Sequence, residues 1–342
     1  ELFMKTEKNK IKIIAEVGVN HNGNLKIAKR LIDVAKKSGA EYVKFQAFKA
    51  TNLVQKKTKS LKYQIKNTKK NDGQFNMLKK LEINKIFIES VLLYCKNKKI
   101  NFLCTPFDIE SLNLLYSLKI FNIKIASGEI NNYFLLKNIA KKANKIFLST
   151  GMADIKEISQ ALEILITNGA KKKNITLLHC HTDYPTNLKN VNLRAMTTMK
   201  NKFNINVGYS DHTIGFETSI AAVALGAQII EKHITLNKKM IGPDHKASME
   251  PKFFYQYVKL LKNTEILLGN KEKKPTQIEK KNMKLVRKSI VAKNNIAKGE
   301  YFSEKNISSK RPQGGLSPMK WNKVIGKKSK YNFKIDQFIK TK

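Results

Sequence analysis

The chain has 342 residues, 42% of them hydrophobic, which is enough for a barrel-sized domain and a small second module. It contains no apolar run of about 18 residues and no signal-peptide core, so we expect neither membrane insertion nor export, and a cytoplasmic protein. The formal charge of +40 comes from lysines spread along the whole chain, so nucleic acid is not an expected partner, although the charge should attract an anionic substrate.

Short apolar runs rich in β-branched residues alternate with amphipathic segments through most of the chain. This alternation is typical of βαβ units and a parallel sheet. Eight such repeats in roughly the length of a barrel favour a closed sheet over an open one, so the sequence predicts an α/β fold of the (β/α)8 TIM-barrel type. The predicted strands begin at Ile11, Tyr42, Asn101, Asn122, Lys145, Ile175, Ile205 and Gln228.

The connecting segments 25–37, 155–168 and 216–225 have the periodicity of amphipathic helices. Segment 49–85 is polar and too long for an ordinary strand-to-helix loop. Because long loops in compact domains are usually functional, we expect this segment to lie on the substrate side of the barrel.

The regular alternation stops after a helix that ends near Leu268. The lysine-rich run that follows reads as a solvated linker, and beyond it short strands and turn signals indicate a compact second domain. The predicted boundaries are 1–270 for the barrel, 271–284 for the linker and 285–342 for the second domain.

Ionisable and hydroxyl side chains gather where the predicted strands end, which is where barrels of this type carry their active sites. Lys44 and Lys124 lie within strands, and a buried lysine is costly unless it is paired. Both therefore predict a buried anion, with Ser127, Ser149 and Ser210 completing a phosphate or carboxylate cradle. The alternative is that the lysines pair with Glu16 or Glu129 as scaffolding.

His212 and His233 lie at the ends of adjacent strands, within reach of one cation. Two neutral imidazoles suit an exchangeable Mn²⁺, Mg²⁺ or Fe²⁺ better than a closed structural Zn²⁺ site. The alternative is two separately hydrogen-bonded histidines.

Several motifs occur together in one order along the chain. They include AEVGVNHNG, KFQAFKA, CTPFD, SGEINN, STGMA, LLHCHTDYP, GYSDHT, IEKHIT, GPDHKAS and KRPQGGLSPM. In this combination the chain resembles the N-acetylneuraminate (sialic acid) synthase family, including its relatives that make legionaminic acid. The C-terminal segment is similar to the antifreeze-like domain of that family (SAF, β-clip).

The resemblance implies a transferase that condenses phosphoenolpyruvate with the open-chain aldehyde of an N-acetylated hexosamine. The expected sugar is N-acetylmannosamine, giving N-acetylneuraminate and phosphate. The alternative within the family is a 2,4-diacetamido-trideoxymannose, giving N,N'-diacetyllegionaminate. A non-enzymatic polyanion-binding protein would need clustered basic residues with interleaved aromatics, and the sequence shows the reverse.

The resemblance also implies roles for individual residues. Glu16 and Glu129 would handle water and protons, and a divalent metal at His212 and His233, with Mn²⁺ preferred, would polarise the aldehyde. The residues implied for phosphoenolpyruvate are Lys44, Lys124, Ser127, Ser149, Thr182 and Ser210, and those implied for the sugar are Gln46, Tyr184, Asp244 and Arg311.

Arg311 would come from the lid domain of a partner subunit, which implies a homodimer. Thr182 and Asn187 stand where family members often have asparagine and proline, and His181 is unusual. These departures bear on the identity of the sugar more than on the reaction type.

Overall fold

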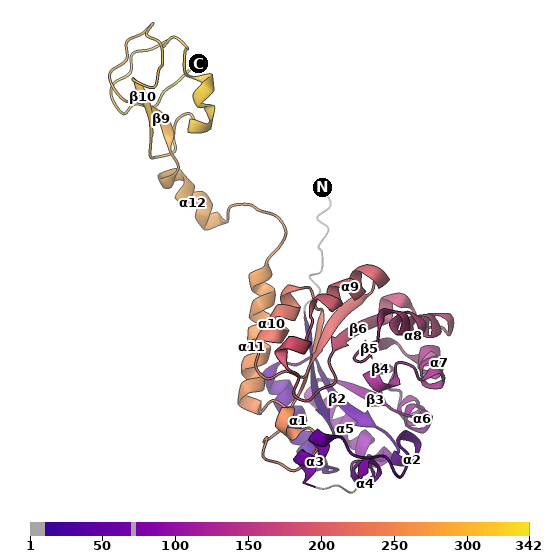
Figure 1. Ribbon diagram of the computed structural model, residues 1–342. Coiled ribbons are helices and arrows are strands. Elements are labelled where there is room, and N and C mark those ends of the chain that lie inside the picture. The colour runs from indigo at the N-terminus through magenta and orange to yellow at the C-terminus, as the bar shows by residue number, and fades with distance from the viewer. Residues whose placement is uncertain (1–10, 70–72, 342) are drawn as a thin grey trace. The chain divides into compact units, whose positions relative to one another are not determined.

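The computed structural model describes residues 11–69 and 73–341, and its first part is a closed barrel of eight parallel strands in chain order (Figure 1). The predicted (β/α)8 barrel is therefore confirmed. The strands are β1 Lys12–Gly18, β2 Tyr42–Ala47, β3 Asn101–Pro106, β4 Asn122–Ile125, β5 Lys145–Ser149, β6 Ile175–Cys180, β7 Asn206–Asp211 and β8 Ile229–His233.

The interior of the barrel is a packed core. Strand residues are buried on both faces, as expected for a parallel sheet covered by helices. One layer of inward-facing side chains fills the barrel and separates its two ends; its members are Ile14, Tyr42, Leu103, Phe147, Leu178 and Ile229.

Helices cover the outside of the strands (Figure 1). The first of them, α1, shows why they form where they do: Asn24 caps its start by accepting from two backbone N–H groups, and Gly39 ends it with a φ of 85°. The main helices are α1 Leu25–Ser38, α5 Lys85–Lys98, α6 Ile109–Ser117, α7 Tyr133–Lys142, α8 Ile155–Thr167, α9 Arg194–Phe203, α10 Glu217–Ala224 and α11 Pro251–Leu268.

The long segment between β2 and α5 contains three short helices, α2 Ala50–Leu53, α3 Lys62–Thr68 and α4 Gly73–Lys79. Its polar composition predicted a loop, but Phe48, Met77 and Leu81 pack with Val19 in a small apolar cluster of their own. Buried apolar contacts therefore fold this segment over the carboxyl end of the barrel strands.

The chain divides into two compact units, Glu1–Gly269 and Asn270–Lys342. In the second, the expected linker is exposed but half helical, because Thr276 and Glu279 form a capping box at the start of α12 Gln277–Val286. Beyond it, β9 Ser289–Ala292 pairs antiparallel with β10 Ile307–Lys310 over a separate core. Within the described residues, no helix is both long and apolar enough to cross a membrane.

Candidate active site

A cluster of buried charges lies inside the barrel, built from neighbouring strands. Lys44 Nζ on β2 lies 3.3 Å from Glu16 Oε2 on β1 and 3.1 Å from Glu231 Oε1 on β8. Gln46 Nε2 donates to Glu16 Oε1 at 3.0 Å, and the Ser210 hydroxyl on β7 donates to Glu231 Oε1 at 2.9 Å. The scaffolding alternative therefore describes Lys44, whose charge is already matched by two carboxylates.

The two carboxylates of this cluster differ in basicity. Burial, opposed by Lys44 and reinforced by Glu231, raises the pKa of Glu16 to about 7. Burial would raise the pKa of Glu231 too, but the charges of Lys124 and Lys44 lower it below its usual value. Glu16 is thus the carboxyl group that can exchange a proton near neutral pH.

Lys124 on β4 has a different environment from Lys44. Its ammonium donates to the Ser149 hydroxyl at 2.6 Å and to the carbonyl oxygen of Ile125 at 3.2 Å, and within the described residues it forms no ion pair. Burial lowers its pKa to about 8, partly offset by the attraction of Glu231. A buried cation held only by neutral oxygens is the group that gains most from an incoming anion.

Gly151, two residues after Ser149, lies at a crowded backbone position. A Cβ atom here would lie 2.8 Å from Thr182 Cγ2, 2.9 Å from Ser127 Oγ and 3.1 Å from Cys180 Sγ. The Gly151 backbone N–H donates to Ser127 Oγ at 3.0 Å. The predicted anion residues Ser127 and Thr182 therefore meet around a backbone position that only glycine fits, while Ser149 contacts Lys124 directly.

The two predicted metal ligands lie side by side. The ring centroids of His212 and His233 are 5.5 Å apart, and the Tyr184 ring lies 4.1 Å from the first and 5.7 Å from the second. Burial lowers the pKa of His212 to about 4 and that of His233 well below its usual value, so both imidazoles are neutral at pH 7.

These histidines fit a divalent cation. His212 Nδ1 donates to the carbonyl oxygen of His181, so the unprotonated Nε2 can bind a metal ion. His233 Nδ1 is buried without a hydrogen-bond partner in the described structure. No group of three or more His, Cys, Asp or Glu residues that could hold a metal occurs in residues 11–69 and 73–341. A cation here would take its remaining ligands from water or substrate, as in an open site.

Three of the predicted sugar residues line one cavity of about 270 Å³ next to the histidines: Gln46, Tyr184 and Asp244. His233 lines it as well. Burial raises the pKa of Asp244 to about 6. Most of the remaining lining residues are apolar and follow β1, β2 or β3: Val19, Phe48, Leu53, Val54, Met77, Leu78, Leu81 and Phe107. Gln64, Gln74 and Pro243 complete the wall.

Two predicted residues are not joined to this arrangement. Glu129, in a 3-10 turn after β4, accepts from Asn132 Nδ2 at 2.7 Å and, within the described structure, forms no ion pair or hydrogen bond with the Glu16 cluster. Arg311 is exposed in the second unit, after β10. Their assigned roles stay predictions.

The sequence places Glu231 and Gly151 at strand ends but assigns neither of them a role. Side chains alternate along a strand, so Glu231 and His233 share the inner face of β8 while Lys232 faces outward. That alternation was the available signal for Glu231. Nothing in the sequence alone signals the crowding around Gly151.

Comparison with known proteins assigns the family. Residues 31–273 match the NeuB family, and residues 287–342 match the SAF domain. The chain is 50% identical to the N,N'-diacetyllegionaminic acid synthase of Campylobacter jejuni, over 96% of this chain and 98% of that one. It is 39% identical to the enzyme of the same name from Legionella pneumophila, over 94% and 90% of the two chains.

A solved structure agrees with these relatives. The N-acetylneuraminic acid (sialic acid) synthetase of Leptospira borgpetersenii, in complex with citrate, is 34% identical, with a TM-score of 0.71 over 81% of this chain and 91% of that one. The chain therefore belongs to the NeuB family of synthases and carries a C-terminal SAF domain.

Proposed function

We propose that this enzyme condenses phosphoenolpyruvate with a 2,4-diacetamido-trideoxymannose to give N,N'-diacetyllegionaminate and phosphate. The observation that carries this choice is the 50% identity, over nearly the full length of both chains, to a synthase of that name. It favours legionaminate over the N-acetylneuraminate first expected from the sequence.

The sugar cavity supports the same choice. Apart from Gln46, Tyr184, His233, Asp244, Gln64 and Gln74, its lining residues are aliphatic or aromatic. A sugar that exchanges hydroxyl groups for an acetamido group and a deoxy position has more apolar surface to bury against such a wall than N-acetylmannosamine has.

In this proposal Lys124, Ser149, Ser127 and Thr182 hold the charged groups of phosphoenolpyruvate around Gly151. Lys44 holds Glu16 and Glu231 in place, and Glu16 takes or gives a proton near the reacting carbons. A divalent ion, Mn²⁺ by preference, would be held by His212 and His233 and, when bound, would polarise the aldehyde oxygen of the sugar.

Oligomeric assembly is part of the proposal. We infer a homodimer in which the SAF domain of one subunit supplies Arg311 to the site of the other. A guanidinium presents a planar fork of donors that suits an acetamido oxygen better than a lysine ammonium does.

The deciding experiment offers the enzyme phosphoenolpyruvate, Mn²⁺ and an equimolar mixture of the two sugars, and identifies the products by mass spectrometry. We expect the legionaminate product to dominate, and phosphate release to require both a sugar and a divalent metal. A dominant N-acetylneuraminate product would reverse the choice of sugar. Phosphate release without any sugar would contradict condensation itself.

A further inference from the structure

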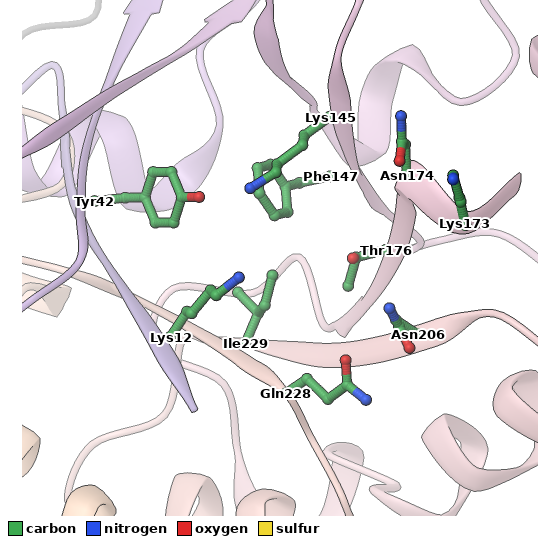
Figure 2. Close-up of a pocket in the computed structure, with 10 residues that line it drawn as sticks. All are labelled: Lys12, Tyr42, Lys145, Phe147, Lys173, Asn174, Thr176, Asn206, Gln228 and Ile229. Carbon is green, nitrogen blue, oxygen red and sulfur yellow. The ribbon is translucent and has the colours of Figure 1, made fainter. Parts of the chain in front are cut away.

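A second hollow, of about 140 Å³, lies at the amino ends of the barrel strands (Figure 2). Its lining includes the first residues of several strands, among them Lys12 on β1, Tyr42 on β2, Lys145 on β5 and Asn206 on β7. Because the strands are parallel, this end is opposite the candidate active site, and the inner layer that contains Tyr42 and Phe147 lies between the two.

The lining of this hollow, which we call the amino-end pocket, is positively charged. Lys12, Lys145 and Lys173 contribute ammonium groups, and no carboxylate is among the lining residues. Within the described residues none of these three ammonium groups forms an ion pair. Glu41, beside Tyr42, is already engaged with the Ile13 backbone N–H and with Lys262. The three lysines are exposed, so water screens their mutual repulsion, and the lining residues themselves supply no counter-charge.

Neutral donors complete the lining: the side-chain amides of Asn174, Asn206 and Gln228 and the hydroxyls of Thr176 and Tyr42. Figure 2 shows the Tyr42 hydroxyl and the ammonium groups of Lys12 and Lys145 extending from three strands toward the middle of the pocket. Burial raises the pKa of Tyr42, so its hydroxyl stays protonated and can donate a hydrogen bond. The arrangement offers donors from several directions and no competing acceptor charge.

We propose that the amino-end pocket binds a small multivalent oxyanion of the phosphate class. Its volume of about 140 Å³ is ample for a phosphate group. Phe147 and Ile229 give the pocket an apolar floor, so the ligand is held by its charged end through the lysines.

The test is isothermal titration of the full-length protein with inorganic phosphate, comparing two double variants that lose the same charge. Lys145→Gln/Lys173→Gln alters the pocket, whereas Lys156→Gln/Lys259→Gln removes two exposed lysines from α8 and α11. We expect the first variant to lose one class of phosphate site, with binding about tenfold weaker or more, and the second to bind as the wild type does. Lys12→Gln alone should give a smaller loss in the same direction.

Further titrations identify the source of the ligand, and one outcome would contradict the proposal. Repeating the titration with phosphoenolpyruvate and with a sugar phosphate shows whether free phosphate or an esterified phosphate group binds more tightly at the pocket; either result supports the proposal. The proposal would be overturned if both double variants bound phosphate equally, or if equimolar chloride displaced the phosphate. The lysines would then serve only to interact with the carboxyl ends of the helices at this end of the barrel. The comparison requires no turnover, so it stands apart from the proposed function.

Discussion

Asp211 and Lys232 form a buried ion pair, with 3.0 Å between Asp211 Oδ2 and Lys232 Nζ, one residue before His212 and one before His233. The two residues are register partners across β7 and β8. Ser219 on α10 donates to Asp211 Oδ2 at 2.7 Å, and Lys232 donates to the Thr213 carbonyl at 2.6 Å. The pair therefore fixes, from the outer face of the sheet, the two strands that carry the histidines.

Replacing Asp211 with Asn should lower the free energy of unfolding by about 3–5 kcal/mol, because it leaves the Lys232 charge buried and unpaired. Adding Lys232→Met should restore part of that loss, as measured by urea unfolding in a double-mutant cycle. As the control, Glu89→Gln removes the exposed pair with Lys85 and should cost no more than about 1 kcal/mol. Simple additivity of the two buried changes would contradict the coupling.

His212→Ala and His233→Ala should each abolish product formation and Mn²⁺ binding while the fold is retained, because each removes one of two protein ligands. Mn²⁺ binding can be followed by electron paramagnetic resonance of the free ion, independently of turnover. His179→Gln is the matched control, since His179 Nε2 is occupied by the Val191 carbonyl at 2.8 Å. Near-normal Mn²⁺ affinity in either alanine variant would remove the pair from the metal site.

Lys124→Met and Lys44→Met should behave differently although both remove a buried lysine. Lys124→Met should raise the KM for phosphoenolpyruvate about tenfold or more, with a smaller change for the sugar. Lys44→Met should instead lower stability, because Glu16 and Glu231 lose the charge between them. Steady-state kinetics and thermal unfolding of both variants distinguish these effects, and an unchanged KM in Lys124→Met would reduce Lys124 to scaffolding.

Stability should fall as the pH drops from about 6.5 to about 4, partly because of His21. Burial lowers the pKa of His21 to about 4, and its Nδ1 accepts from the Gly23 N–H at 2.9 Å. Between the pKa of His21 in the unfolded chain and its lower pKa in the folded protein, only the unfolded chain binds the extra proton. The free energy of unfolding therefore falls by up to about 1.4 kcal/mol per pH unit because of this one group.

His21→Asn keeps an acceptor for Gly23 but cannot titrate. Its stability should therefore fall less steeply with decreasing pH than that of the wild type, while the two proteins should run parallel above pH 7. Urea unfolding at a series of pH values checks this. Equal slopes below pH 6.5 would show that His21 does not contribute.

Mixing inactive Arg311→Ala with inactive His212→Ala subunits should restore activity if the lid acts on the neighbouring barrel. In a mixed dimer one site carries both defects and the other carries neither, so free exchange gives about a quarter of wild-type activity. Native mass spectrometry establishes that the subunits exchange. No recovery under those conditions would contradict the swapped lid.

Much of the barrel could be predicted because each strand is a short β-branched run and parallel strands bring their carboxyl ends to one rim. That rule placed Lys124, Ser149 and the two histidines correctly at the strand ends. It could not decide that Lys44 pairs with both Glu16 and Glu231, because the pairing depends on the stagger of three strands around a closed sheet.

The segment between β2 and α5 was harder to predict for a different reason. Its helices are too short for a clear period, and they are stabilised by contact with Val19 and Phe48 rather than by their own propensity. The relation of Arg311 to a barrel is a matter of assembly, which the pattern of a single chain does not encode.

The lining of the proposed sugar cavity has a genetic consequence. Phe48, Leu53, Val54, Gln64, Gln74, Met77, Leu78 and Leu81 all come from one contiguous stretch of the chain, whereas Lys124, Ser127, Ser149 and Gly151 are encoded well downstream. Recombination confined to codons 48–81 would therefore change which sugar the enzyme accepts. The residues proposed to bind phosphoenolpyruvate would stay unchanged.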